Sequence, residues 1–392
     1  MTLLKIPRKF NPLEVLLGLG LGFGYMTSLR FAGPVGIAEL MILFALILLI
    51  QNHGKTFFKY QLNAAGLIKL YMVFAVFVIL PIMTMASLIF VGLETDPQYI
   101  ISFMMGITLS FLIVEALKVK RIKMANVVLF FACAYIITNL ITILFFPSSL
   151  VEDRYTGAAD NPNQLMFYAS SASLLLVIYH PKLSLLFVPI IAWITIKSGS
   201  DAYFLTLFVT IVIYGLIFIF FGKRFSFGVG LMISSIVGLI LLYIILTNFL
   251  DQIYLVWQTA DQGGSRSSLL INAYKVSITS PFFGYGAGNF SGMETTFQSW
   301  EAHNTFLDLS MQFGMIFPAI IYFVFFAFLF NRIKYGYYMQ AAFVAAFIVS
   351  GLFHFSGRHF FFWVEFAIFY YYVFYEQKHR PVKTLNPKEA VS

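Results

Sequence analysis

Residues 67–92 read LIKLYMVFAVFVILPIMTMASLIFVG, an apolar run of membrane-spanning length in which Lys69 is the charged residue. A helix needs about 20 predominantly apolar residues to cross a bilayer. The run is continuous, whereas the strands of a membrane β-barrel alternate between apolar and polar residues. The stretch therefore predicts a transmembrane helix.

Similar runs along the chain predict an all-α integral membrane protein with about twelve transmembrane helices in a single polytopic domain, residues 1–392. The chain is 60% hydrophobic and 11% charged, with a mean hydropathy of +0.85, whereas soluble domains contain about 25% charged residues. The first run is expected to be an uncleaved span. The predicted spans cover 13–29, 34–50, 67–92, 99–117, 124–146, 163–179, 183–197, 202–221, 226–249, 304–330, 337–353 and 360–376.

The distribution of basic residues predicts the orientation of these helices. Most of the 25 lysines and arginines fall in alternate loops and in both terminal segments, and cytoplasmic loops of membrane proteins are enriched in such residues. Both termini, including a tail at 378–392, are therefore expected in the cytoplasm. The formal charge of +8 reflects this bias and does not indicate nucleic-acid binding. The single cysteine, Cys133, excludes an internal disulfide and makes a thiolate metal site improbable.

The longest polar stretch, 251–302, is expected to form a large outer loop between the ninth and tenth helices. Within it, GGSRSSLLINAYKVSITS (263–280) has apolar residues at helical spacing and predicts a short amphipathic helix. Arg266 falls near its amino-terminal end, where backbone N–H groups attract anions. A helix start and an arginine together indicate a phosphate-binding site.

Other cations are predicted on the same outer side: Arg30, Arg154, Lys197 and Arg358. Arginine binds phosphate through two parallel hydrogen bonds, so several such side chains in separate loops could converge on one anionic group. The alternative is that each of them pairs with a local carboxylate or a lipid headgroup.

His303 precedes the tenth apolar run, and its imidazole is suited to accept a proton from a hydroxyl. The alternative is a helix-capping or interfacial histidine. Asn304 follows it. Three carboxylates, Glu39, Asp308 and Glu365, lie inside apolar runs, where such groups are either functional or engaged in buried hydrogen bonds. No second histidine or cysteine near His303 has zinc-ligand spacing.

The glycines of GYGAGN (284–289) have two readings. A glycine-rich turn can bind phosphate, but no P-loop lysine follows this one. A tight turn in which Gly284, Gly286 and Gly288 supply positive φ angles is the favoured reading.

These pieces together resemble the bacterial O-antigen ligase and O-antigen polymerase superfamily of membrane glycosyltransferases. The matching stretches are RYTGAADNPNQL (154–165), GGSRSSLLINAYKVSITSPFFGYGAGNF (263–290) and AHNTFLDLSMQFGMI (302–316). The residues that carry the family pattern are Arg266, Pro281, Gly284, Gly286, His303, Asn304 and Gly314.

The resemblance implies an enzyme of the bacterial cytoplasmic (inner) membrane that needs no metal or cofactor. Its donor would be a glycan on undecaprenyl pyrophosphate at the outer leaflet, with Arg266 holding the pyrophosphate and His303 acting as the base on the acceptor hydroxyl. Family members often carry a Ser-Arg where this chain has Ser200-Asp201. Asp201 therefore removes an expected cation, and Arg154, Lys197 or Arg358 would have to replace its charge.

Three functions remain open from the sequence. The first is a polymerase that joins lipid-linked repeat units into O-antigen, capsular polysaccharide or exopolysaccharide. The second is a ligase that transfers a finished glycan to lipid A-core. The third is a transporter or channel, for which charges near the bilayer midplane would be expected instead of at the outer helix ends. The expected partners are the lipid-linked donor, a glycan or lipid acceptor, membrane lipids, and a flippase and a chain-length regulator.

Overall fold

The computed structural model describes residues 11–27, 36–145, 150–151, 154–159, 162–198, 201–221, 263–352 and 354–376. Regular structure in these ranges is helical apart from one antiparallel pair of two-residue strands, β1 (Leu150–Val151) and β2 (Arg154–Tyr155). The predicted span at 226–249, the predicted tail at 378–392 and the start of the large loop at 251–262 lie outside the described residues.

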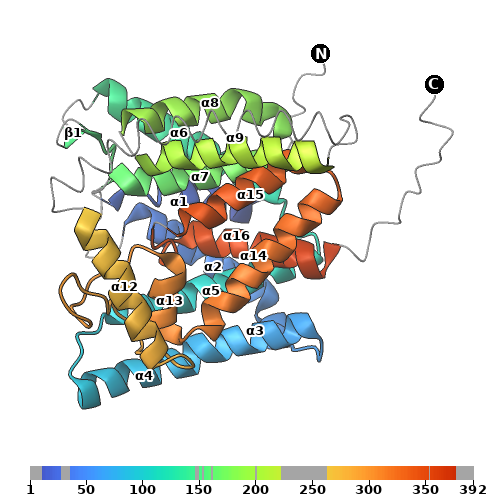
Figure 1. The fold of residues 1–392 in the computed structure, drawn as a ribbon. Coiled ribbons are helices and arrows are strands. Elements are labelled where there is room, and N and C mark those ends of the chain that lie inside the picture. The colour runs from blue at the N-terminus through green and yellow to red at the C-terminus, as the bar shows by residue number, and fades with distance from the viewer. Residues whose placement is uncertain are drawn as a thin grey trace.

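Most of the helices are apolar, and they lie at several different angles to one another (Figure 1). One π-helical segment, η2 (Ala75–Ile79), joins α3 to α4, and a second one, η3 (Ser87–Val91), extends α4, so that Ala64–Val91 is one continuous helix. The first of them ends just before Pro81, which lacks the N–H group that a regular helix would use. The α-helices are α1 (Pro12–Phe23), α2 (Ile37–Phe57), α3 (Ala64–Phe74), α4 (Leu80–Ala86), α5 (Pro97–Lys118), α6 (Met124–Phe145), α7 (Pro162–Tyr179), α8 (Pro181–Lys197), α9 (Asp201–Phe221), α12 (Gly263–Thr279), α13 (Thr305–Phe313), α14 (Ile316–Lys334), α15 (Tyr338–Ser350) and α16 (Phe360–Phe374).

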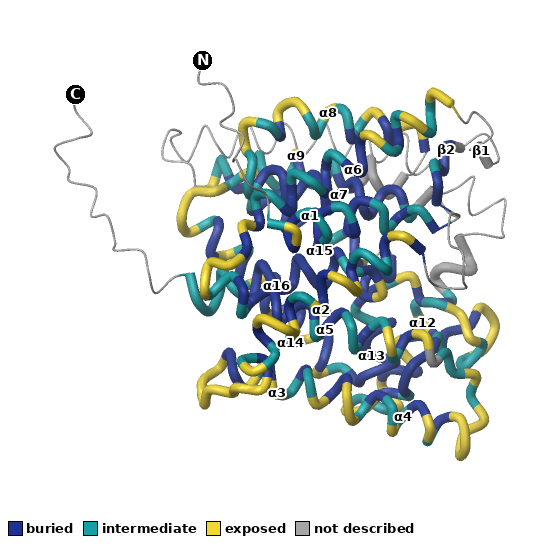
Figure 2. Tube along the Cα trace, turned by 180° about the vertical axis from the view of Figure 1, so that it is seen from behind, coloured by how far each residue is buried: buried dark blue, intermediate teal, exposed yellow. Residues whose placement is uncertain are grey.

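Within the described part of the chain, five helical segments are long and apolar enough to cross a membrane: Ile37–Phe57, Ala64–Val91, Gln98–Lys118, Met124–Phe145 and Ile316–Lys334. Several shorter apolar helices pack among them. Large apolar side chains such as Phe90 and Leu185, 83% and 80% exposed, point away from the protein, and Figure 2 shows exposed residues concentrated on α3, α4 and α8 around a buried centre. The fold is therefore that of an α-helical membrane protein.

Small residues allow the helices to approach closely, as is common in membrane proteins. A Cβ atom at Gly18 or Gly22 of α1 would lie 2.4 or 2.5 Å from the Cβ atoms of Phe130 and Ala134 on α6. A Cβ at Gly106 of α5 would lie 2.4 Å from the ring of Trp363 on α16. Substitution at these glycines would push neighbouring helices apart.

An aromatic layer ties α5, α13 and α16 together. The Phe103 ring lies 4.9 Å from that of Phe313 and 6.1 Å from that of Trp363, both edge to face. The indole N–H of Trp363 donates to the Gly357 carbonyl at 2.8 Å. This bond fixes the loop that precedes α16, and with it the position of Arg358.

The predicted single span at 304–330 is wrong in one respect, because the helix breaks near Gly314. Gly314 has φ +80°, which ends α13, and α14 starts at Ile316. The break is stabilised by the 281–286 turn: the Met311 carbonyl accepts from the N–H of Tyr285 at 2.7 Å, and Met315 N–H donates to the Pro281 carbonyl at 2.7 Å. These bonds occupy groups that a helix end leaves unpaired. The largely apolar composition of the segment fits an unbroken helix, and Gly314 and Pro318, in the first turn of α14, are the local signals of the break.

Candidate functional site

His303 lies in the tight loop that leads into α13, and this helix packs beside α12 (Figure 1). Its φ is +53°, in the left-handed region that side chains other than glycine rarely adopt. The imidazole is 47% exposed. A functional group held in an uncommon backbone conformation and open to solvent is an arrangement found at active sites.

Two neighbours hold this loop in place. The side chain of Asn304 caps α13 by accepting the N–H of Leu307 at 3.0 Å. Asp308, one turn into the helix, accepts the N–H groups of Ala302 at 2.8 Å and of Asn304 at 3.0 Å. Its two oxygens therefore bind the residues on either side of His303. Asn304 and Asp308 thus hold the loop that carries His303.

Asp308 is almost completely buried, and burial raises the pKa of its carboxyl from 3.8 to about 8. The nearby Glu301 also raises the pKa, while the two backbone N–H donors and Arg358 lower it. Burial prevails because removing a carboxylate from water costs more than two neutral hydrogen bonds return. The protonation state of the group that holds the His303 loop is therefore sensitive to pH near neutrality.

The Glu301 carboxylate connects three side chains. The guanidinium of Arg358 donates a hydrogen bond to its Oε1 atom, and the Tyr99 hydroxyl donates to the same oxygen at 3.2 Å. The His303 Nδ1 atom lies 3.7 Å from the other oxygen, Oε2. Burial favours the neutral form of Arg358, but Glu301, Tyr99 and Asp308 together outweigh it and raise the pKa of the guanidinium. An arginine and an imidazole thus share one carboxylate.

Arg358 also lines a cavity of about 190 Å³ between the helix ends. The lining of this cavity combines polar and charged side chains with apolar ones such as Ile101 of α5, which is 62% exposed. Its lining consists of Gly24, Glu39, Gln98, Ile101, Ser102, Met105, Tyr168, Arg358, His359 and Phe360. A cation beside an exposed apolar helix face suits a ligand with an anionic head and a hydrocarbon chain.

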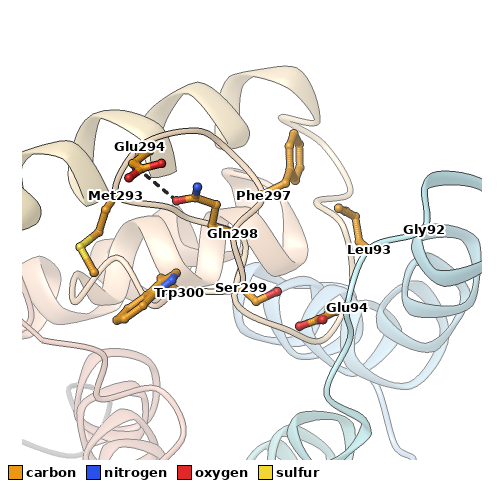
Figure 3. A pocket seen from close by; sticks show the side chains of 9 residues that line it. All are labelled: Gly92, Leu93, Glu94, Met293, Glu294, Phe297, Gln298, Ser299 and Trp300. Atoms are coloured by element: carbon orange, nitrogen blue, oxygen red, sulfur yellow. Dashed lines mark hydrogen bonds between the residues drawn. The ribbon is translucent and has the colours of Figure 1, made fainter.

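A second, larger cavity of about 650 Å³ lies between the segment after η3 and the loop that leads to His303 (Figure 3). Its lining consists of Gly92, Leu93, Glu94, Met293, Glu294, Phe297, Gln298, Ser299 and Trp300. Because Trp300 is followed directly by Glu301, the wall of this cavity continues into the Arg358–Glu301–His303 cluster.

The structure describes the other residues predicted for the cationic site only in part. Arg30 lies outside the described residues. Arg154 is in β2, Asp201 begins α9 and Arg266 is in the first turn of α12, but their side chains are outside the described part of the structure. Lys197, at the end of α8, has its ammonium 5.7 Å from the Trp193 ring centre.

The glycine turn has a structural role, in agreement with the interpretation that the sequence favoured. Gly284 and Gly286 have φ angles of +67° and +88°. A Cβ at Gly284 would lie 2.4 Å from the Gln312 backbone, and one at Gly286 would lie 2.2 Å from the Thr84 nitrogen. The turn therefore packs α13 against α4, with no room for a phosphate between them.

The carboxylates of the apolar runs have local partners. Glu39 accepts the N–H of Gly36 at 2.9 Å and caps α2. Glu365 is fully buried and accepts from the Ser171 hydroxyl at 2.6 Å. Both contacts fit the structural reading of these residues. Among the described residues, no group of three His, Cys, Asp or Glu side chains is placed to hold a metal ion.

Sequence reasoning did not single out Tyr99 or His359. Tyr99 opens an apolar helix and His359 lies beside Phe360, and aromatic residues at such positions are most often core. The one available signal was position, since both lie at helix ends on the side predicted to face outward.

No protein-family model matches this chain, and no curated protein is significantly similar to it. The composition and the spanning helices define an α-helical membrane protein.

Proposed function

We propose that this protein is a membrane glycosyltransferase. It would join oligosaccharide repeat units carried on undecaprenyl pyrophosphate into O-antigen, capsular polysaccharide or exopolysaccharide. The reaction would take place at the outer leaflet of a bacterial inner membrane, in a chain of about twelve spans with both termini in the cytoplasm. The observation that carries the proposal is that Glu301 links Arg358, at the edge of a cavity lined in part by apolar residues, to His303.

The donor is assigned to the cavity beside Arg358. The guanidinium would neutralise the charge that develops on the leaving pyrophosphate, a role for which arginine is well suited. The polyprenyl chain would extend along the exposed apolar face of α5 that includes Ile101. Arg266, in the first turn of α12, is a second cation for the same group, as the resemblance to the O-antigen family suggests.

The acceptor hydroxyl is assigned to His303. As its oxygen bonds to the anomeric carbon, the bond from that carbon to the pyrophosphate oxygen breaks, and the hydroxyl proton passes to the imidazole. Glu301, 3.7 Å from Nδ1, stabilises the imidazolium that forms. The sugar–pyrophosphate bond is already activated, so no further energy source is required. Attack opposite the leaving group would invert the anomeric centre.

Chain extension by the purified protein tests this proposal. The protein would be placed in lipid nanodiscs with lipid-linked repeat units purified from the cells that produce it, and products would be resolved by length. His303→Ala is expected to reduce the rate about 10²- to 10⁴-fold, the range for loss of a general base. Arg358→Ala is expected to reduce it about 10²- to 10³-fold.

The matched control is Arg121→Ala, because Arg121 is an exposed arginine that hydrogen-bonds Asn52 far from this cluster. Extension at the wild-type rate by both His303→Ala and Arg358→Ala would refute the mechanism. A protein that makes no long product from repeat units alone, but transfers glycan once lipid A-core is added, would be a ligase.

A further inference from the structure

The 650 Å³ cavity has two walls that come from distant parts of the chain. One is the segment Gly92–Glu94, directly after η3, and the other is the loop 293–300 (Figure 3). The Asp96 N–H donates to the Ala287 carbonyl at 3.0 Å, and the Ala287 N–H donates to the Thr84 hydroxyl at 2.8 Å. These bonds fix the two walls relative to each other.

The loop wall has a defined conformation. Ser291 and Trp300 form a bridge in which each N–H donates to the other's carbonyl at 3.0 Å. Phe297 and Ser299 have φ angles of +65° and +61°, so with His303 three non-glycine residues within seven positions adopt the left-handed region. Such conformations persist only where surrounding contacts enforce them.

The loop is also attached to α12. The Asn272 side chain donates to the Gly292 carbonyl at 2.8 Å, and the Ser291 hydroxyl donates to the Leu269 carbonyl at 2.6 Å. All of these donors and acceptors are buried. The cavity is therefore a preformed feature of the fold.

The chemistry of the lining suits a carbohydrate. Trp300 is 49% exposed, and an exposed indole offers an apolar face on which the C–H face of a sugar ring can stack. Glu94, Glu294 and Gln298 supply carboxylate and amide oxygens that accept hydrogen bonds from sugar hydroxyls. Pockets of this kind combine aromatic surface with a few polar groups that fix orientation.

The charge of the lining restricts which sugars fit. Two of the lining residues are glutamates and none is basic. A phosphate, a uronic acid or another anionic group would face these carboxylates without a counter-charge. Neutral sugars and amine-bearing sugars would not be repelled, and an ammonium group would be attracted.

We infer that this cavity is the acceptor subsite and that it binds an uncharged or amine-bearing oligosaccharide. The inference rests on the proposed function. The subsite lies next to the proposed base, since Trp300 is three positions before His303, whereas the proposed donor pyrophosphate lies at Arg358 beyond Glu301. The sugars of the acceptor that lie in this cavity would then be neutral or cationic, and a phosphorylated sugar at this position is disfavoured.

Binding without turnover tests the subsite. The full-length protein in nanodiscs would be titrated by isothermal calorimetry with three tetrasaccharides: chitotetraose, which is neutral, the glucosamine tetramer, which is cationic, and tetragalacturonate, which is anionic. The wild type is expected to bind the first two and not the third. Trp300→Ala is expected to weaken binding about tenfold or more, equivalent to about 1.4 kcal/mol, and Trp300→Phe to retain most of it.

Two further variants make the test specific. Trp193→Ala removes a similarly exposed tryptophan on α8, 45% exposed, and is expected to bind as the wild type does. The double variant Glu94→Gln/Glu294→Gln is expected to lose the preference for the cationic over the anionic probe. Unchanged affinity in Trp300→Ala, or tightest binding of tetragalacturonate, would overturn the inference.

The same measurements separate this inference from the proposed function. His303→Ala is expected to abolish extension while leaving tetrasaccharide binding intact. If the wild-type protein binds the tetrasaccharides in a way that depends on Trp300 but extends no chains, the acceptor subsite is retained. The proposed glycosyltransferase function is then rejected. Chain extension with an unchanged KM for the acceptor in Trp300→Ala would reject the subsite alone.

Discussion

Arg358 hydrogen-bonds Glu301 across 57 positions of the sequence, joining the loop before α16 to the loop before α13. The pair places a cation beside His303 and leaves the arginine at the edge of a cavity. Glu301 is the less exposed partner, with its side chain 13% exposed against 43% for Arg358. Loss of the arginine therefore leaves a mostly buried carboxylate without its principal partner.

A double-mutant cycle on this pair is expected to show coupling. Arg358→Ala and Glu301→Ala should each lower thermal stability, and the double variant should lose less than the sum, by about 1 kcal/mol for a partly exposed pair. The midpoint of thermal unfolding in detergent measures the stability of each variant. Strict additivity would mean that the pair contributes nothing to stability. Arg121→Ala, combined with Glu301→Ala, is the matched control and should be additive.

Asp308 predicts a dependence of stability on pH. Its pKa is raised to about 8 in the folded protein, so between about pH 4 and pH 8 the folded state holds a proton that the unfolded state has lost. Stability from this group is therefore highest at low pH and falls as the pH rises toward 8, by at most about 1.4 kcal/mol per pH unit. Unfolding midpoints measured from pH 5 to pH 8.5 would follow this decline.

Asp308→Asn is the control for that dependence, because it cannot ionise. It should lower stability at every pH, since its amide N–H₂ replaces one oxygen that accepts from Ala302 or Asn304. The difference in stability between wild type and variant should shrink as the pH rises. A constant difference across the range would show that Asp308 does not titrate there.

Much of the fold follows from the sequence, because bilayer physics leaves few alternatives to apolar helices. The short helix predicted within the large loop is α12, which starts at Gly263 and ends before Pro281. The predicted positive φ angles are likewise confirmed at Gly284 and Gly286, but not at Gly288. Both predictions depend on local signals, namely helical spacing, a proline and a glycine pattern.

The rest depends on contacts between distant segments, which no local pattern records. The sequence left Arg358 with two readings, an anion-binding cation or the partner of an acid, and the structure has it line a cavity while paired with Glu301. The break at Gly314 was missed because its apolar surroundings fit an unbroken helix equally well. The break is stabilised by the turn at 281–286, which belongs to the large loop that precedes α13 in the chain.

Gly286→Ala is expected to destabilise the protein more than Gly336→Ala. Both residues have positive φ angles, +88° and +76°, so alanine strains the backbone at either by about 1–2 kcal/mol. A Cβ at Gly286 would also collide with the backbone of Thr84, whereas nothing lies within 4 Å of one at Gly336. Thermal unfolding compares the two variants, and equal losses would contradict close packing of the turn on α4.

His303→Gly is expected to be more stable than His303→Ala, by up to about 1 kcal/mol. Both lose the imidazole and the proposed activity, but only glycine adopts φ +53° without strain. Unfolding midpoints of the two inactive variants provide the comparison. If the alanine variant is as stable or more stable, the loop does not store strain at this residue.

The attachment of the 291–300 loop to α12 has a mechanical consequence. Arg266 lies in the first turn of that helix, and the residues bonded to the loop, Leu269 and Asn272, follow within two turns. A tilt or slide of α12 would carry Arg266 and the wall formed by Trp300 as one rigid unit. Such a motion of α12 would keep a constant distance between the proposed donor and acceptor sites while the growing chain advances.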